Sequence, residues 1–187
     1  MRSAVLAPAS KEYPFRECEH SLRKMRKCLD LYLSRAGPLG FGVFAAKPFA
    51  GGQAVMLDLD GDFYDRVVSY RELQQSGFDL SNTLQVGMDA FKLPSGSIDD
   101  FTNHSCEPNT GIRLLPEGVS VLALRDIAAH EELTYDYSTY LNNPYERMAC
   151  LCGAATCRGT IGNFKTLPEH LKTKYLTLGI VGHFCKG

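Results

Sequence analysis

Residues 101–111 read FTNHSCEPNTG, and a later segment, CLCGAATC, holds Cys150, Cys152 and Cys157 in the spacing C-x-C-x4-C. The first segment supplies a fourth thiol, Cys106. Four thiolates at about 2.3 Å form the closed tetrahedral set of a structural zinc site, which leaves no position for water. We therefore predict one zinc ion that joins the C-terminal segment to the core of the fold.

The cysteines leave two alternatives open. The clustered thiols can be free, with Cys106 buried on its own, or the four can hold an iron–sulfur cluster. Cys18, Cys28 and Cys185 are expected to be small hydrophobic side chains. His183 and Cys185, two positions apart, are a weak candidate for a second metal site.

Length and charge limit the class of protein. A chain of 187 residues with 44% hydrophobic content fits one domain with a substantial core. Lys and Arg number 20 against 21 Asp and Glu, so we expect no direct binding of nucleic acid. The basic residues between 23 and 27 are expected to be a solvated face.

The sequence also indicates a compartment. It shows no apolar run of about 18 residues and no signal-peptide core, so we expect no contact with membranes. An odd number of cysteines suits a reducing compartment better than a disulfide framework. The sequence therefore predicts an intracellular protein, cytoplasmic or, in a eukaryote, possible in the nucleus.

The hydrophobic pattern predicts a mostly β fold. Apolar residues alternate over 29–34, which is the period of a strand with one buried face. Further apolar segments are short and are separated by Gly and Pro at about every eight to ten residues, which argues against a parallel α/β sheet. Strands are predicted over 29–34, 43–46, 54–59, 84–86, 91–93, 111–115 and 119–124.

Turns and helices are predicted from local signals. Asp60-Gly61 indicates a hairpin turn, and GFG at 40–42 indicates a bend or a ligand cradle. A short amphipathic helix is predicted over 16–27. Ser69 with Glu72 predicts a capping box for a helix that ends at Ser76.

A second helix is expected near the C-terminus. Thr166 and Glu169 have the spacing of a capping box, and Pro168 falls in the first turn. The apolar residues that follow have helical spacing as far as Gly179, where the helix should end.

Three motifs occur in order along the chain: GFG at 40–42, NHSCEPN at 103–109 and ELTYDY at 132–137. With the run CLCGAATCRGTIG behind them, they resemble the SET-domain protein-lysine methyltransferases that carry a cysteine-rich post-SET segment. The resemblance covers about residues 29–164 and includes no cysteine-rich pre-SET block. It implies a fold of several small curved β-sheets with pseudoknot-like threading of the C-terminal part of the domain.

The resemblance also implies a division of the chain. Residues 1–28 are expected to be an N-terminal arm with a short helix, and residues 29–145 the SET domain. Residues 146–164 would be the zinc-binding post-SET segment, and residues 165–187 a C-terminal helix and tail.

The same resemblance implies roles for individual residues. The methyl donor would be S-adenosylmethionine, Tyr137 the catalytic tyrosine, and Tyr135 the residue that limits how many methyl groups fit. Phe164 would close the lysine channel, and Leu151 would pack near the adenine. The residues implied to bind the donor are Gly40, Phe41, Gly42, Asn103, His104, Tyr137, Leu151 and Phe164.

The expected reaction is methylation of a lysine side chain in a protein or peptide partner. The target amine must be neutral although its free pKa is about 10.4, and a nearby sulfonium together with desolvation lowers that pKa. The resemblance also implies that a tyrosine at position 135, which limits how many methyl groups fit, favours mono- or dimethylation. A catalytically inactive SET scaffold that binds a peptide is the alternative, and the acidic residues between 58 and 65 are either a surface for a basic peptide or a solvated turn.

Overall fold

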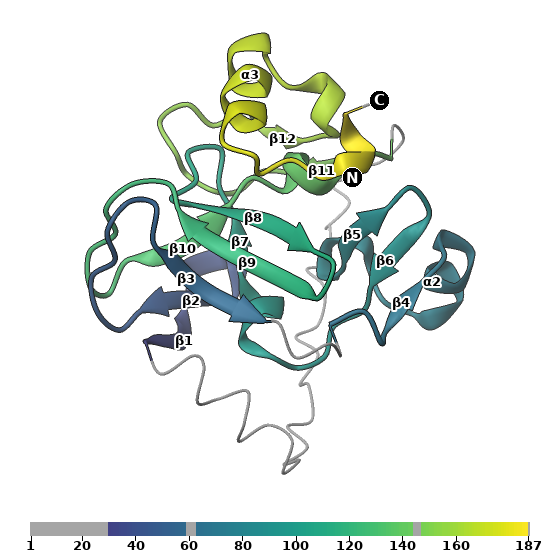
Figure 1. The fold of residues 1–187 in the computed structure, drawn as a ribbon, viewed down its shortest axis with the longest axis horizontal. Coiled ribbons are helices and arrows are strands. Elements are labelled where there is room, and N and C mark those ends of the chain that lie inside the picture. The colour runs from purple at the N-terminus through teal and green to yellow at the C-terminus, as the bar shows by residue number, and fades with distance from the viewer. Residues whose placement is uncertain (1–29, 59–62, 144–146, 187) are drawn as a thin grey trace, which may run out of the picture.

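The computed structural model describes residues 30–58, 63–143 and 147–186 of the chain. Within these ranges, short strands form several small sheets, and two α-helices lie on the outside (Figure 1). The helices are α2 (Tyr70–Ser76) and α3 (Glu169–Thr177). The strands are β1 (Leu31–Arg35), β2 (Phe41–Ala45), β3 (Ala54–Asp58), β4 (Val67–Val68), β5 (Leu84–Gly87), β6 (Ala90–Lys92), β7 (Asn103–His104), β8 (Thr110–Leu115), β9 (Gly118–Ala123), β10 (Glu132–Tyr135), β11 (Met148–Ala149) and β12 (Thr160–Ile161). The predicted mostly β fold of small sheets is confirmed.

One sheet has the order β1-β2-β10-β7 and joins distant parts of the chain. Its strand β10 pairs antiparallel with β2 on one side and parallel with β7 on the other. In the parallel pair, Thr134 lies opposite Asn103 and Tyr135 lies opposite His104. This sheet therefore places the NHSCEPN and ELTYDY motifs side by side, next to the strand that contains part of GFG.

The sheet β3-β9-β8 contributes much of the hydrophobic core. Its strands β8 and β9 form a hairpin whose register runs from Thr110 opposite Ala123 to Leu115 opposite Gly118. Val119, Ser120 and Val121 of β9 are all buried, so this part of the strand is covered on both faces.

The sheet β4-β6-β5 carries α2 on its outer side (Figure 1). Ser69 caps this helix through its Oγ, which accepts a hydrogen bond from the Glu72 N–H, and the Glu72 carboxylate accepts one from the Ser69 N–H at 2.8 Å. Gly77 ends the helix in the left-handed region at φ 75°. The predicted capping box is confirmed.

The C-terminal residues fold back onto the β core. Tyr175 of α3 is 0% exposed, and Ile180 packs against β8 at Gly111. In Figure 1 this part of the chain lies above the β3-β9-β8 sheet. The helix ends at Thr177, and Gly179 follows with φ 65°, as the sequence predicted for the end of the helix.

The predicted capping box at the start of α3 is wrong. Thr166 lies in a 3-10 turn (Phe164–Thr166), where its Oγ1 donates to the Asn163 carbonyl oxygen at 2.8 Å. The helix begins instead after Pro168, with no side-chain cap. Asn163 competes successfully for Thr166 because its side chain also accepts the Thr166 N–H.

Replacing Gly111 with alanine is expected to destabilise the C-terminal segment on β8. A Cβ at this position would lie 2.7 Å from Cγ2 of Ile180, closer than side-chain carbons pack. The free energy of unfolding should fall by about 1–3 kcal/mol, measured by denaturant unfolding. In the double variant with Ile180→Ala the two effects should not add, because the clash is gone; additive effects would contradict this contact.

Some predicted features lie outside the described residues. These are the N-terminal arm, the helix over 16–27, the basic cluster, Cys18, Cys28 and the turn at Asp60-Gly61. The proposed domain boundaries stay predictions. Within the described ranges no helix is both long enough and apolar enough to cross a membrane.

Candidate active site and metal centre

Asn103 connects the three sequence motifs. Its Nδ2 donates to the Phe41 carbonyl oxygen at 3.0 Å and to Glu132 Oε1 at 2.8 Å. A Cβ at Gly42 would lie 3.0 Å from the same Nδ2 and would also collide with the Glu132 carboxylate. Glycine is therefore required at position 42 by close packing, whereas Gly40, with φ 88°, is required by backbone conformation.

A second asparagine, Asn109, fixes strand β10. Its Oδ1 accepts the Thr134 N–H at 2.9 Å, and its Nδ2 donates to the Glu132 carbonyl oxygen at 2.7 Å and to Glu131 Oε1 at 2.8 Å. The side chain is buried, and every polar atom of its amide has a partner. Both asparagines of NHSCEPN thus hold the ELTYDY segment in register.

Two tyrosines stack beside this junction. The ring centroids of Tyr135 and Tyr137 are 4.7 Å apart, and the Tyr137 hydroxyl donates to the Thr102 carbonyl oxygen at 2.9 Å. Burial, with a smaller effect of Glu132, raises the pKa of Tyr137, and burial raises the pKa of Tyr135 well above its ordinary value. Both hydroxyls therefore stay protonated at neutral pH, so neither is suited to act as a base.

The two tyrosines border two cavities. The first has a volume of ≈ 20 Å³ and is also lined by Tyr140 and Met148. The second, of ≈ 60 Å³, is also lined by Thr102 and by the charged residues Lys92, Asp99 and Asp100. A single water occupies about 10–15 Å³ by this measure, so the tyrosine pair faces narrow spaces that suit an unbranched chain.

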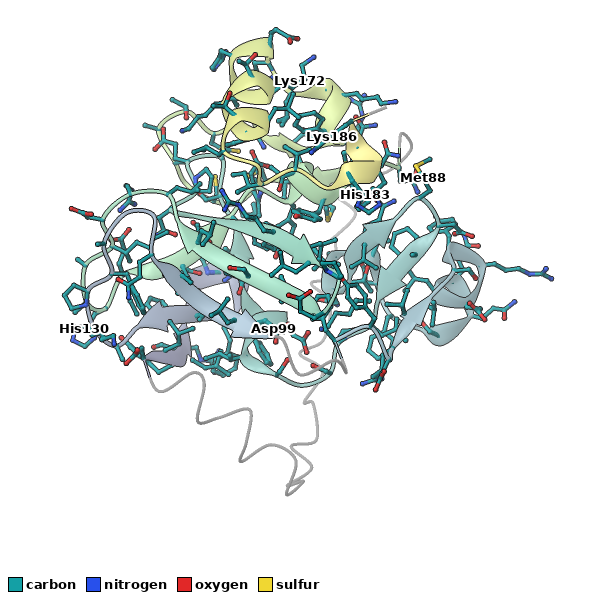
Figure 2. The ribbon with its side chains drawn as sticks, in the orientation of Figure 1. Met88, Asp99, His130, Lys172, His183 and Lys186 are labelled. Atoms are coloured by element: carbon teal, nitrogen blue, oxygen red, sulfur yellow. The ribbon has the colours of Figure 1, made fainter. Side chains whose placement is uncertain are left out.

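A charged cluster of the buried Lys92 with two half-buried carboxylates lines the second cavity. Lys92 Nζ lies 3.4 Å from Asp99 Oδ2 and 3.5 Å from Asp100 Oδ1. Burial and the neighbouring Asp99 carboxylate raise the pKa of Asp100. Asp99 is labelled in Figure 2 near the lower end of the sheet β3-β9-β8. The motifs gave no indication of these three residues.

His104 links the tyrosines to the cysteines. Its Nδ1 accepts the Tyr137 N–H at 3.1 Å, and its Nε2 lies 3.4 Å from Cys106 Sγ. Burial lowers the pKa of His104 to about 4, so the ring is neutral. Since Nδ1 is the acceptor, the neutral ring carries its proton on Nε2, which donates to the sulfur.

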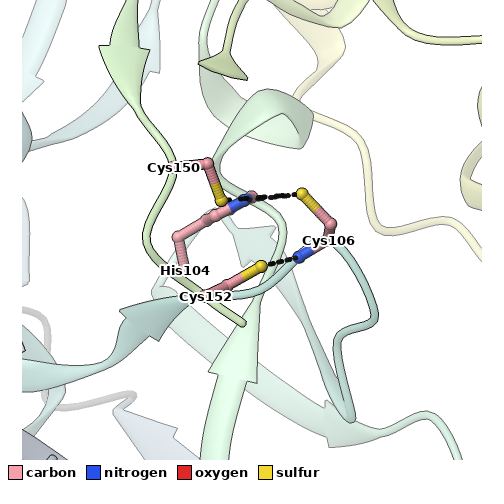
Figure 3. A group of neighbouring side chains, drawn as sticks. All are labelled: His104, Cys106, Cys150 and Cys152. Atoms are coloured by element: carbon pink, nitrogen blue, oxygen red, sulfur yellow. Dashed lines mark hydrogen bonds between the residues drawn. The ribbon is translucent and has the colours of Figure 1, made fainter. Parts of the chain in front are cut away.

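The metal centre brings Cys106, Cys150 and Cys152 together with His104 (Figure 3). The four candidate ligand atoms all lie within 4.8 Å of one another. The sulfurs of Cys106 and Cys150 are 3.7 Å apart. A tetrahedral zinc with Zn–S bonds of about 2.3 Å separates two sulfurs by about 3.8 Å, so the spacing of these two sulfurs fits zinc.

Cys157 lies beside this group. Its thiol contacts the thiols of Cys150 and Cys152, but its sulfur is outside the set that lies within 4.8 Å of all the others, and the residue is exposed. Burial opposes ionisation of Cys152, yet N–H donors from Cys106 and Ala154 and the neighbouring thiols lower its pKa to about 7. A thiol that ionises readily is a good metal ligand.

The other predicted site residues are placed as follows. Leu151 is 60% exposed and Phe41 49% exposed, as open walls of a binding site would be. Phe164 packs in the main core, where its N–H donates to the Leu141 carbonyl oxygen. Cys185 is buried in the same core, as predicted, and His183 is exposed near the C-terminus (Figure 2). Within the described residues, the cluster around Cys106 is the one group of side chains found that could hold a metal ion, and it does not include His183 or Cys185.

Asp136, between the two tyrosines, binds two groups from later in the chain. Its Oδ1 accepts from Arg158 Nη2 at 2.8 Å, and its Oδ2 accepts from the Tyr175 hydroxyl at 3.1 Å. Arg158 directly follows Cys157 in the sequence, and this position next to a predicted metal ligand is a signal by which the residue could have been found. Tyr175 had none, because it occupies an ordinary apolar position of a helix.

The small sheets, the stacked tyrosines and the adjoining cysteine cluster agree with the SET-domain resemblance of the sequence. Residues 40–138 match the SET domain family. The chain belongs to the SET-domain family.

Curated relatives carry the same domain. Histone-lysine N-methyltransferase ATX2 of Arabidopsis thaliana is 33% identical over 147 residues, which cover 71% of this chain and 13% of that protein. The H3 lysine-4-specific histone-lysine N-methyltransferase of Saccharomyces cerevisiae is 32% identical over 151 residues, 75% of this chain and 14% of that protein. The chain thus spans about one seventh of these relatives' length.

Solved structures share the fold. The methyltransferase domain of human histone-lysine N-methyltransferase SETMAR superposes with a TM-score of 0.55 at 23% identity, covering 71% of this chain and 58% of that one. KRYPTONITE in complex with mCHG DNA and SAH gives a TM-score of 0.51 at 25% identity, covering 70% and 28%. Because that complex contains DNA, our expectation that this chain binds no nucleic acid is not confirmed and stays a prediction.

Proposed function

We propose that this chain transfers a methyl group from S-adenosylmethionine to a lysine side chain of a protein. The observation that carries the proposal is the Tyr137 hydroxyl, fixed on the Thr102 carbonyl oxygen in a cavity wall next to the Asn103-His104 pair. The SET-domain membership and the relatives named histone-lysine N-methyltransferases support it.

The donor would lie along the GFG strand and the Asn103-His104 pair. When bound, it supplies a methyl group activated by a sulfonium. Asn103 has its amide nitrogen committed to Phe41 and Glu132, so its carbonyl oxygen is the group free to accept a hydrogen bond from a ligand. The exposed side chains of Phe41 and Leu151 provide apolar surface for a flat ring.

The acceptor lysine would enter between the tyrosines. The Tyr137 hydroxyl donates its hydrogen bond to the Thr102 carbonyl oxygen, so the tyrosine oxygen can accept a hydrogen bond from the amine and orient the lone pair of the nitrogen. The cavities have room for few waters, so an amine that fills them would be largely desolvated, and desolvation lowers the pKa of an amine. The side chains of this site thus align and desolvate the amine and need not remove its proton.

We assign zinc to Cys106, Cys150, Cys152 and Cys157. His104 Nε2 would donate a hydrogen bond to the Cys106 sulfur, because its Nδ1 is occupied by the Tyr137 N–H. Such a zinc has only a structural role: it would hold the cysteine segment (residues 148–161) against the NHSCEPN loop.

The extent of methylation and the location are further proposals. Tyr135 lines the same two cavities as Tyr137, so its hydroxyl would take up space beside a target amine, which would favour mono- or dimethylation. Reduced cysteines agree with a cytoplasmic or nuclear protein. Histones are the first substrates to test, since the relatives are named for them.

Calorimetry with S-adenosylmethionine followed by a transfer assay tests the proposal. The chain is incubated with donor carrying a labelled methyl group and with a lysine peptide library that includes histone sequences, and products are identified by mass spectrometry. We expect donor binding and label on lysine. Absence of donor binding contradicts the proposal, and binding without transfer favours the alternative of an inactive scaffold.

A further inference from the structure

We propose that Tyr175 of α3, together with Arg158, is a positioning residue that holds Asp136 and thereby fixes Tyr137. The inference rests on the methyl transfer proposed above. It assigns the C-terminal helix to the catalytic machinery, although the SET-domain match ends at residue 138.

Asp136 is a buried carboxylate whose donors come from three places. The side chain is 0% exposed. Its own turn supplies the Ser138 N–H at 3.1 Å, the cysteine segment supplies Arg158 Nη2 at 2.8 Å, and α3 supplies the Tyr175 hydroxyl at 3.1 Å. A buried carboxylate is stable only while such donors are in place, so its position is set by them.

Tyr175 is built for this contact. Its ring is 0% exposed within the main core, and its hydroxyl meets a carboxylate 39 residues earlier in the chain. Burial and the Asp136 charge raise the pKa of Tyr175, so the hydroxyl remains a donor at all moderate pH values. Hydrogen bonds to charged groups are the stronger kind.

Arg158 connects the same carboxylate to the metal centre. Its backbone N–H lies 3.4 Å from Cys106 Sγ, while its guanidinium reaches Asp136 and, at 3.4 Å, the Ser138 hydroxyl. One residue therefore holds both the cysteine segment and the ELTYDY segment.

Fixing Asp136 fixes its neighbours. Tyr137 follows it in the chain and hydrogen-bonds through its N–H to His104 and through its hydroxyl to Thr102. A displacement of about 1 Å of a reacting or orienting group can reduce a rate by about a hundredfold. Loosening Asp136 should therefore reduce the rate of transfer more than the binding of either substrate.

The decisive variant is Tyr175→Phe, which removes one hydroxyl and keeps the ring. We expect kcat to fall about tenfold, because that factor corresponds to the loss of one hydrogen bond to a charged group. KM for the peptide, donor affinity and zinc content should stay unchanged. Amide hydrogen exchange at Tyr137 and Ser138 should accelerate by a similar factor. Arg158→Lys, which keeps the charge but not the guanidinium geometry, should change the same two quantities in the same direction.

Tyr64→Phe is the matched control. The Tyr64 hydroxyl is partly buried and, like that of Tyr175, donates a hydrogen bond within the fold. Its acceptor, however, is the Leu115 carbonyl oxygen in the β8–β9 hairpin, at 2.7 Å. This variant should lower Tm without changing kcat or the exchange of Tyr137. If Tyr175→Phe behaves like Tyr64→Phe, Tyr175 is merely structural and the inference is overturned.

The exchange measurement separates this inference from the proposed function. It needs no turnover, so accelerated exchange at Tyr137 and Ser138 in Tyr175→Phe supports the positioning role even in a chain that transfers no methyl group. An active wild-type chain whose Tyr175→Phe variant shows unchanged exchange and unchanged kcat overturns the positioning role and leaves the proposed function intact.

Discussion

Cys150→Ser is expected to remove bound zinc and to weaken binding of S-adenosylmethionine by at least about tenfold, while the β core stays folded. Cys150 is buried, and its sulfur contacts that of Cys106, so it lies at the centre of the metal cluster. Without it the cysteine segment loses its attachment to the NHSCEPN loop, beside which the donor would bind. Metal analysis of the purified chain should give about one zinc per wild-type chain and much less for the variant.

Cys185→Ala is the control for this experiment. Cys185 is also buried but packs in the main hydrophobic core, away from the other cysteines. Its replacement should lower stability and leave zinc content and donor affinity unchanged. If Cys150→Ser keeps its zinc, or if a chelator unfolds the whole chain at the concentration that releases the metal, the separate attachment of the cysteine segment is wrong.

Tyr137→Phe is expected to reduce kcat by about a hundredfold or more, as losses of single preorganised polar groups do, with little change in donor affinity. The hydroxyl is oriented by the Thr102 carbonyl oxygen, to which it donates at 2.9 Å. Single-turnover transfer of labelled methyl measures the rate, and calorimetry measures donor binding.

Tyr135→Phe is the matched comparison, because it removes the other hydroxyl of the stacked pair. It should keep transfer activity and shift the product toward higher methylation states, since space is gained beside the amine. Mass spectrometry of the peptide product reads this directly. If the two variants lose activity equally, Tyr137 has no distinct role.

Local signals in the sequence predicted the strands and α2 well. The alternation over 29–34 predicted β1, and the Ser69–Glu72 pair predicted the cap of α2. Both predictions succeeded because each depends on residues only a few positions apart. The same type of signal failed at Thr166, where Asn163 offered a competing partner. No strand was predicted at β7 or β10, which were identified only as motifs and whose pairing joins residues about thirty positions apart.

Parts of the candidate site could not be read from the chain. The position of His104 against the Cys106 sulfur and of Tyr175 against Asp136 depends on tertiary packing. Lys92, Asp99 and Asp100 likewise form a cluster only because β6 and the 3-10 turn Ile98–Phe101 meet at one cavity. Such contacts leave no spacing in the sequence that a motif could record.

Cys150 follows Cys106 by 44 positions, so the thiols of the cluster leave the ribosome at different times. A growing chain that has left the ribosome only as far as β10 can already pair its strands, but it offers one thiolate of the cluster and cannot retain the ion. Coordination becomes possible only once the last cysteines emerge, so metal uptake would mark the completion of this part of the molecule. Scarcity of zinc would then yield chains with an ordered β core and an unfinished donor pocket.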